Sequence, residues 1–190
     1  MLYTQKIQHA IRFAIKIHES DQKQKRKGKD VPYIVHPLTV AIILATAGAS
    51  EDVIVAGILH DTIEDSIKEK KVTEKMLTER FGENVYKLVR SVTEDDKILS
   101  WDIRKAEALE HIKTFSNDSV FLKSADLISN TREIIDDFIK GGDGMFKKFA
   151  APKEKVLRVY INAMEAILKK WPGNPLASDL KDILKIIKTI

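Results

Sequence analysis

The stretch VIVAGILHDTIED, residues 53–65, decides the fold. Its first part, residues 53–59, is apolar all round, and a helix with apolar side chains on every face is buried in a helical core. Polar residues then follow abruptly: a histidine and three carboxylates lie within the last six positions. We therefore predict one helix over residues 51–65 that is buried along most of its length and carries reactive side chains at its C-terminal end.

The remaining segments repeat the helical spacing of apolar residues. In the first of them, Ile7, Ala10, Ile11, Ala14 and Ile17 fall on one helical face. With only 8 Gly and 5 Pro, the composition favours long helices over short strands joined by tight turns. We expect an all-α fold, a single-domain bundle of about eight or nine helices over residues 1–190. The expected helices cover residues 7–17, 37–46, 51–65, 73–80, 83–92, 101–115, 119–140, 153–170 and 176–190.

The composition is that of a globular protein, because 44% of the residues are hydrophobic and 32% are charged. Cysteine is absent, which excludes disulfides and thiolate ligands. The sequence has no apolar run of the roughly 18 residues that a membrane span needs, and residues 1–6 lack the pattern of a signal peptide. We expect a cytoplasmic protein with no membrane partner.

The net charge of +4 is too small to indicate nucleic-acid binding by itself. One basic run could be a nucleic-acid patch, a solvated loop or a strap that binds an anion. Stacking platforms and zinc-finger spacing are absent from the sequence, so we expect no nucleic-acid partner. The run consists of Lys23, Lys25, Arg26, Lys27 and Lys29.

The end of the predicted buried helix concentrates negative charge. Spacing of four residues places His60 over Glu64, and it likewise places Asp61 over Asp65. Neighbouring carboxylates repel one another, oppose the helix dipole at a C-terminus, and are costly to bury without a partner. A divalent cation would remove this conflict. The alternative is an acidic helix end that faces solvent, with His60 merely packed.

Two further polar features have open interpretations. Lys123, Asp126 and Asn130 form one stripe at spacings of three and four, beside an apolar face. Such a stripe either lines a polar pocket or faces solvent. His36 is an isolated histidine among apolar residues, which is more often a packed side chain than a ligand. A partnership with His60 would make it a ligand candidate.

Longer strings then point to a family. They are RKG at 26–28, PYIVHPL at 32–38, LHDTIED at 59–65, FG at 81–82 with VTE at 92–94, and KSADLISN at 123–130. In this order they resemble the HD-domain phosphohydrolases, helical enzymes with an adjacent His-Asp pair. The likeness is to the hydrolase domain of the bifunctional alarmone synthetase/hydrolases and, more closely, to their small stand-alone relatives. It covers residues 1 to about 170, so we expect no synthetase domain.

The resemblance implies a reaction and a metal. Members of the family hydrolyse the 3′-pyrophosphate of ppGpp and pppGpp, giving GDP or GTP and pyrophosphate, and they use Mn²⁺. The acidic pair beside the attacking water corresponds to Glu64 and Asp65. Imidazole and carboxylate ligands would also suit Fe²⁺ or Zn²⁺. The positions that correspond to the metal ligands are His36, His60, Asp61 and Asp126.

The resemblance also implies contacts with the nucleotide. Arg26 matches the position whose guanidinium covers the nucleobase, and Lys27 follows it in the same basic run. Asn130 lies where the family contacts the nucleoside, and Tyr160 matches a tyrosine of the same pocket. Lys123 is a candidate for a phosphate contact, because a substrate with four or five phosphates needs cations at the rim of its pocket.

Other interpretations remain open. Residues 131–133, Thr-Arg-Glu, depart from the Met-Arg-Thr often seen in the bifunctional enzymes, which leaves the guanine-specific contacts open. The chain could be an HD-domain hydrolase of another nucleotide, such as a dNTP, a nucleoside monophosphate or a cyclic nucleotide. It could also be a nucleotide sensor without catalytic activity. The sequence does not indicate an oligomeric state.

Overall fold

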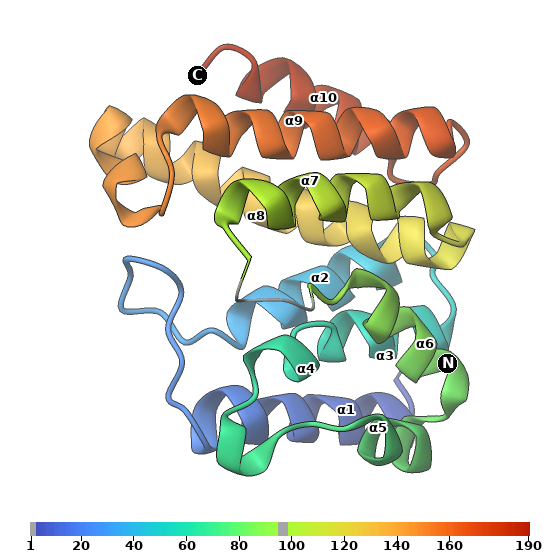
Figure 1. Cartoon of the computed structure of the whole chain (residues 1–190). Coiled ribbons are helices and arrows are strands. Elements are labelled where there is room, and N and C mark those ends of the chain that lie inside the picture. Colours follow the sequence, from blue (N-terminus) through green and yellow to red (C-terminus); the bar gives the residue numbers. More distant parts are fainter. Residues whose placement is uncertain (1–2, 95–98) are drawn as a thin grey trace. The chain divides into compact units, whose positions relative to one another are not determined.

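Every regular element of the computed structural model is helical in the residues that it describes, 3–94 and 99–190 (Figure 1). Within these ranges, β structure is limited to an isolated antiparallel bridge between Lys25 and Pro32. The prediction of an all-α fold is confirmed. Contacts divide the chain into two compact units, Met1–Asp95 and Asp96–Ile190, and each is described by itself. That residues 1–190 form a single domain stays a prediction.

The first unit is organised around α3, which packs against α1, α2 and α6. All residues of α3 from Val53 to Leu59 are buried, as the run of apolar residues predicts. Helix α5 packs against α6 in the same unit. The elements of this unit are α1 (Gln5–Ile15), the π-helix η1 (Lys16–Ser20), α2 (Val35–Thr46), α3 (Glu51–Leu59), α4 (Thr62–Asp65), the short 3₁₀ helix η2 (Lys68–Lys70), α5 (Glu74–Phe81) and α6 (Glu83–Val92).

The second unit contains the longest helix, α8, which packs against α9, α10 and η4. The apolar face that was predicted beside its polar stripe is buried. The elements are α7 (Trp101–His111), the 3₁₀ helix η3 (Ile112–Thr114), α8 (Asn117–Gly141), the 3₁₀ helix η4 (Gly142–Lys148), α9 (Lys153–Lys170) and α10 (Ala177–Ile187). The buried positions of the apolar face are Leu122, Ala125, Ile128, Thr131 and Ile135.

Local chemistry sets the helix ends. The hydroxyls of Thr4, Thr73 and Ser116 accept hydrogen bonds from backbone N–H groups of the first turns of α1, α5 and α8, which satisfies donors that the helix itself cannot pair. Gly82 separates α5 from α6 with φ +91°, a conformation that favours glycine. The helix predicted over 119–140 begins earlier, because Ser116 provides its cap.

The prediction of one helix over residues 51–65 is wrong in one respect, because two helices cover this stretch. Helix α3 ends at Leu59, and α4 begins at Thr62. Asp61 stands at the N-cap position of α4 with φ −91° and ψ −5°, outside the regular α conformation. The acidic residues therefore lie in the first turn of a short helix, where negative charge is favoured, and not at the end of a long one.

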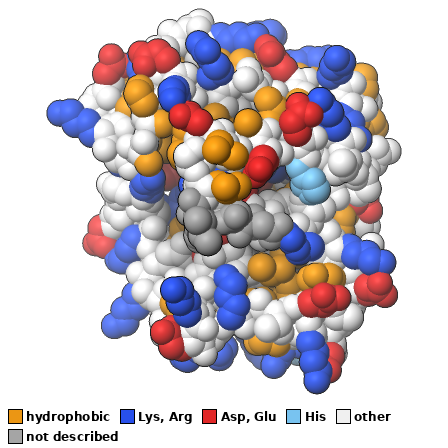
Figure 2. Space-filling view, viewed as in Figure 1, with side chains coloured by type: hydrophobic (Ala, Val, Ile, Leu, Met, Phe, Trp, Pro, Cys, Tyr) orange, Lys and Arg blue, Asp and Glu red, His pale blue; other side chains and the backbone are white. Residues whose placement is uncertain are grey.

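Surface charge is mixed on the face drawn in Figure 2. Lysine and arginine side chains alternate there with aspartate and glutamate, among the residues that the structure describes. This pattern agrees with the small net charge of +4. None of the described helices combines the length and the apolar character that a membrane crossing requires.

A close approach between α2 and α3 depends on Gly57. A methyl group at this position would lie 2.6 Å from Cδ1 of Leu44 and 3.4 Å from Cγ1 of Val40. Leu44 and Val40 are fully buried, so they have little room to move. The absence of a side chain at Gly57 therefore allows the two helices to pack closely.

We expect Gly57→Ala to lower the free energy of unfolding by about 1 kcal/mol. Alanine improves helix propensity by about 0.5–1 kcal/mol, but crowding a packed core costs about 1–3 kcal/mol. Urea denaturation measures the difference. In a Leu44→Ala background the new methyl group has space, so there the same substitution should no longer destabilise. A stabilising effect of Gly57→Ala in the wild-type background would contradict this packing.

Candidate metal centre

His36 enters the site from the first turn of α2. Pro37 follows it, and a proline suits the first turn of a helix because the N–H that it lacks has no helical partner there. The His36 ring is buried, with 3% of its surface exposed. It lies edge-on to the ring of His60, with centroids 5.1 Å apart. The two histidines, 24 positions apart in the sequence, therefore come together within the first unit.

His60 is oriented by the backbone of α3. Its Nδ1 lies 2.8 Å from the carbonyl oxygen of Gly57, which can only accept a hydrogen bond, so Nδ1 carries the proton. This leaves Nε2 directed toward Asp61, whose Oδ2 is 3.1 Å away. The same Asp61 oxygen lies 3.7 Å from Nε2 of His36. Two imidazole nitrogens thus converge on one carboxylate oxygen, an arrangement that a divalent cation satisfies.

Tyr33 holds that carboxylate. Its hydroxyl donates a hydrogen bond of 2.6 Å to Oδ2 of Asp61, and its ring lies edge-on to His36 with centroids 5.9 Å apart. Burial raises the pKa of the Tyr33 hydroxyl far above its usual value, and the negative charges of Asp61 and Asp65 raise it further. The hydroxyl therefore keeps its proton and acts as a donor.

The acidic pair Glu64 and Asp65 lies in α4, and both side chains are partly exposed. The α4 turn is closed by a hydrogen bond of 2.9 Å from the Asp65 amide to the Asp61 carbonyl. The amide of Glu94 approaches Oε2 of Glu64 at 3.4 Å. Asp65 accepts a hydrogen bond of 2.9 Å from the side-chain amide of Gln24. The pair thus belongs to the same unit as the two histidines and Asp61.

The basic run forms a loop beside this group. The Arg26 amide donates to the carbonyl of Val31 at 2.8 Å, next to the bridge between Lys25 and Pro32. The guanidinium of Arg26 lies over the ring of Tyr33, 5.3 Å from its centroid. Lys27 is exposed. Arg26 of this loop therefore contacts Tyr33, whose hydroxyl donates the hydrogen bond to Asp61.

In the second unit, α8 carries the predicted polar stripe. Asp126 is buried, with 7% of its surface exposed. Lys123 donates to its Oδ2 at 2.7 Å, and Asn130 donates to its Oδ1 at 2.6 Å. This burial argues against a solvent-facing interpretation of the stripe at Asp126. Tyr160 is half-buried in α9.

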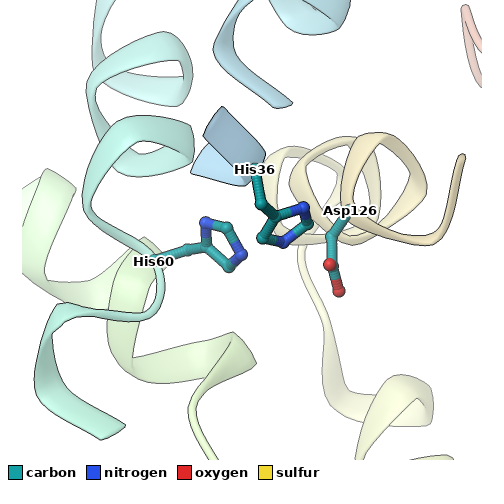
Figure 3. A group of neighbouring side chains, drawn as sticks. All are labelled: His36, His60 and Asp126. Carbon is teal, nitrogen blue, oxygen red and sulfur yellow. The ribbon is translucent and has the colours of Figure 1, made fainter. Parts of the chain in front are cut away.

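Figure 3 shows the buried histidine and aspartate side chains that could hold a metal ion: His36 on α2, His60 at the end of α3, and Asp126 on α8. His36 and His60 belong to the first unit, and Asp126 belongs to the second. Nitrogen and oxygen donors without thiolate suit Mn²⁺, Fe²⁺ or Zn²⁺. The chemistry of these donors therefore fits a divalent transition metal.

Two residues of the site were missed by sequence reasoning. Tyr33 is three positions before His36, and a buried tyrosine hydroxyl needs a hydrogen-bond partner, so its place beside a candidate ligand was a usable signal. Gln24 gave no such signal. It lies in a polar stretch without periodicity, and its partner Asp65 is 41 positions away.

Comparisons with known proteins identify the family of this chain. A family model described as the HD domain matches residues 10–140. The chain belongs to the HD-domain family. A guanosine-3′,5′-bis(diphosphate) 3′-pyrophosphohydrolase of Aquifex aeolicus is 37% identical over 134 residues, 70% of this chain and 18% of that protein. A second relative, the guanosine-3′,5′-bis(diphosphate) 3′-pyrophosphohydrolase MESH1 of Xenopus tropicalis, is 36% identical over 130 residues, 67% of this chain and 69% of that protein.

A solved structure supports the fold. The structure, titled as a metazoan ortholog of SpoT that hydrolyzes ppGpp and plays a role in starvation responses, matches with a TM-score of 0.78, covering 97% of each chain. Its sequence is 23% identical, so this likeness concerns the HD-domain fold alone. The family and the fold thus rest on independent comparisons.

We expect Tyr33→Phe to weaken Mn²⁺ binding about 10- to 100-fold, as is usual when a group that orients a ligand is removed. The substitution keeps the ring and deletes only the hydrogen bond to Asp61. Isothermal titration of the metal-free protein with Mn²⁺ measures the change. Tyr86→Phe is the matched control, since its hydroxyl donates to Glu74 on an exposed surface. Equal Mn²⁺ affinities of the two variants would refute this role for Tyr33.

Proposed function

We propose that this chain is a metal-dependent hydrolase that removes the 3′-pyrophosphate of ppGpp and pppGpp, releasing GDP or GTP and pyrophosphate. The observation that carries the proposal is the convergence of His36 and His60 on one oxygen of Asp61, in a chain of the HD-domain family. The names of the relatives from Aquifex aeolicus and Xenopus tropicalis supply the substrate class.

The proposed metal is Mn²⁺, with His36, His60, Asp61 and Asp126 as its ligands. When bound, such a cation supplies Lewis acidity, which stabilises charge on a phosphoryl oxygen and makes water more acidic. The tautomer of His60 supports this assignment, because a protonated Nδ1 on the Gly57 carbonyl leaves Nε2 as the donor atom. Asp126 is suited to the same role because it is a buried carboxylate held at both oxygens.

The chain's own side chains would handle the proton and the nucleotide. In this proposal Glu64 accepts the proton of the attacking water, and Asp65 helps to orient that water. In this proposal the guanidinium of Arg26, which lies over the ring of Tyr33, also stacks on the guanine base. The remaining proposed nucleotide contacts are Lys27 and Lys123 for phosphates, and Asn130 and Tyr160 for the nucleoside. The proposed partner is the nucleotide alone, and the proposed location is the cytoplasm.

We expect Glu64→Gln to lower kcat about 10²- to 10⁴-fold, the usual contribution of a general base. Mn²⁺ affinity should be retained, because Glu64 is not a proposed ligand. Pyrophosphate release from ppGpp and metal titration measure the two effects. Glu69→Gln makes the same chemical change on the exposed η2 turn and should leave kcat unchanged. A near-normal kcat of Glu64→Gln would remove Glu64 from the mechanism.

A panel of nucleotides tests the substrate. With Mn²⁺ added, the wild-type protein should hydrolyse ppGpp, measured as pyrophosphate release, at least about tenfold faster than it consumes dNTPs, nucleoside monophosphates or cyclic nucleotides, because only ppGpp offers both guanine and a 3′-pyrophosphate. Preference for another nucleotide would indicate a different HD-domain hydrolase. Tight binding of ppGpp without turnover would indicate a sensor.

A further inference from the structure

A buried histidine lies behind the candidate site, in the π-helix η1. His18 is fully buried, and its ring packs against the ring of Tyr33, with centroids 5.0 Å apart. Its carbonyl accepts a hydrogen bond of 2.8 Å from the amide of Gln24, whose own carbonyl accepts from Tyr33 at 2.8 Å. A single turn of π-helix within helical structure often marks a functional site. The backbone of Gln24 is thus fixed on both sides, by the segment that holds His18 and by the segment that leads to His36.

The side chain of Gln24 joins His18 to Asp65. Its Nε2 donates to Oδ2 of Asp65 at 2.9 Å, and its Oε1 lies 2.7 Å from Nδ1 of His18. An ionised carboxylate can only accept, so the amide nitrogen must face Asp65 and the amide oxygen must face His18. Nδ1 of His18 must then carry a proton. The His18 tautomer and the direction of the amide therefore determine each other.

The second ring nitrogen fixes the charge of His18. Nε2 is buried and has no hydrogen-bond partner among the described residues. A proton there would be a buried, unpaired donor on a cation, which is costly. His18 is accordingly neutral, with its one proton on Nδ1. A neutral imidazole and a neutral amide together direct a hydrogen bond at Asp65 without adding charge. Asp21, in contrast, accepts its hydrogen bond from the charged side chain of Lys70, and this bond lowers the pKa of the Asp21 carboxyl.

We propose that Gln24, oriented by His18, is a positioning residue that fixes the carboxylate of Asp65 for its part in holding the attacking water. This inference rests on the proposed hydrolytic function. It assigns different roles to the two residues that hold carboxylates of the site. Tyr33 holds Asp61, a proposed metal ligand, whereas Gln24 holds Asp65, which is not a proposed ligand. Loss of Gln24 should therefore act on turnover and not on metal affinity.

The test replaces Gln24 by methionine, which has a similar length and cannot form either hydrogen bond. With ppGpp and Mn²⁺, we expect kcat to fall about 10- to 100-fold, while KM and the Kd for Mn²⁺ change less than about twofold. Gln22→Met is the matched control. Its amide donates to the carbonyl of Ile17 at 3.2 Å in the same segment, so the control removes a comparable hydrogen bond without reaching Asp65.

The outcomes are distinct. Equal kcat values for Gln24→Met and Gln22→Met would overturn the proposal, as would a loss of Mn²⁺ affinity as large as the loss of kcat. If the wild-type protein and Gln22→Met both fail to hydrolyse ppGpp, the proposed function is contradicted instead, and the same pair is compared on the nucleotide that the panel identifies.

A second measurement does not depend on activity. In ¹⁵N NMR spectra of the metal-free protein near neutral pH, His18 should show a protonated Nδ1 and an unprotonated Nε2. In the Gln24→Met variant, His18 should no longer be held in that tautomer. Gln22→Met should leave it unchanged. A His18 protonated only on Nε2 in the wild-type protein would overturn the assigned direction of the Gln24 amide, whereas a doubly protonated His18 would overturn only its assigned neutral charge.

Discussion

The candidate site depends on how closely α2 and α3 approach each other. Gly57 has no side chain at the contact, and a methyl group there would overlap Cδ1 of Leu44. The same glycine has a second role, because its carbonyl accepts the hydrogen bond that orients His60. One residue thus sets both the spacing between the helices and the direction of a ring at the end of one of them. His36 and His60 face each other as a result.

In the first unit, the candidate site residues His36, His60 and Asp61 lie where helices begin or end. His36 lies in the first turn of α2, His60 follows the last residue of α3, and Asp61 precedes α4. Helix ends have backbone groups that the helix cannot pair, and side chains there can turn away from the helix axis. The interruption after Leu59 therefore allows His60 and Asp61 to point toward one centre. A continuous helix would prevent this, because adjacent side chains on a helix point in different directions.

The fold could be predicted because it follows from periodicity. Apolar spacing identified the helices, and the change from apolar to acidic residues after Leu59 indicated a reactive end. The break between α3 and α4 was missed because the spacing of four continues through it, and Asp61 looks like any other helical residue. Gln24 was missed because its interactions join a loop to a distant turn, and local sequence carries no pattern for such contacts.

Tyr33 has a consequence that reaches beyond the orientation of Asp61. Its ring is covered by the guanidinium of Arg26, while its hydroxyl contacts Asp61. One rigid side chain therefore connects the group proposed to meet the nucleobase with a group proposed to hold the cation. If binding at one of these positions changes the affinity at the other, thermodynamic reciprocity makes the change equal in both directions.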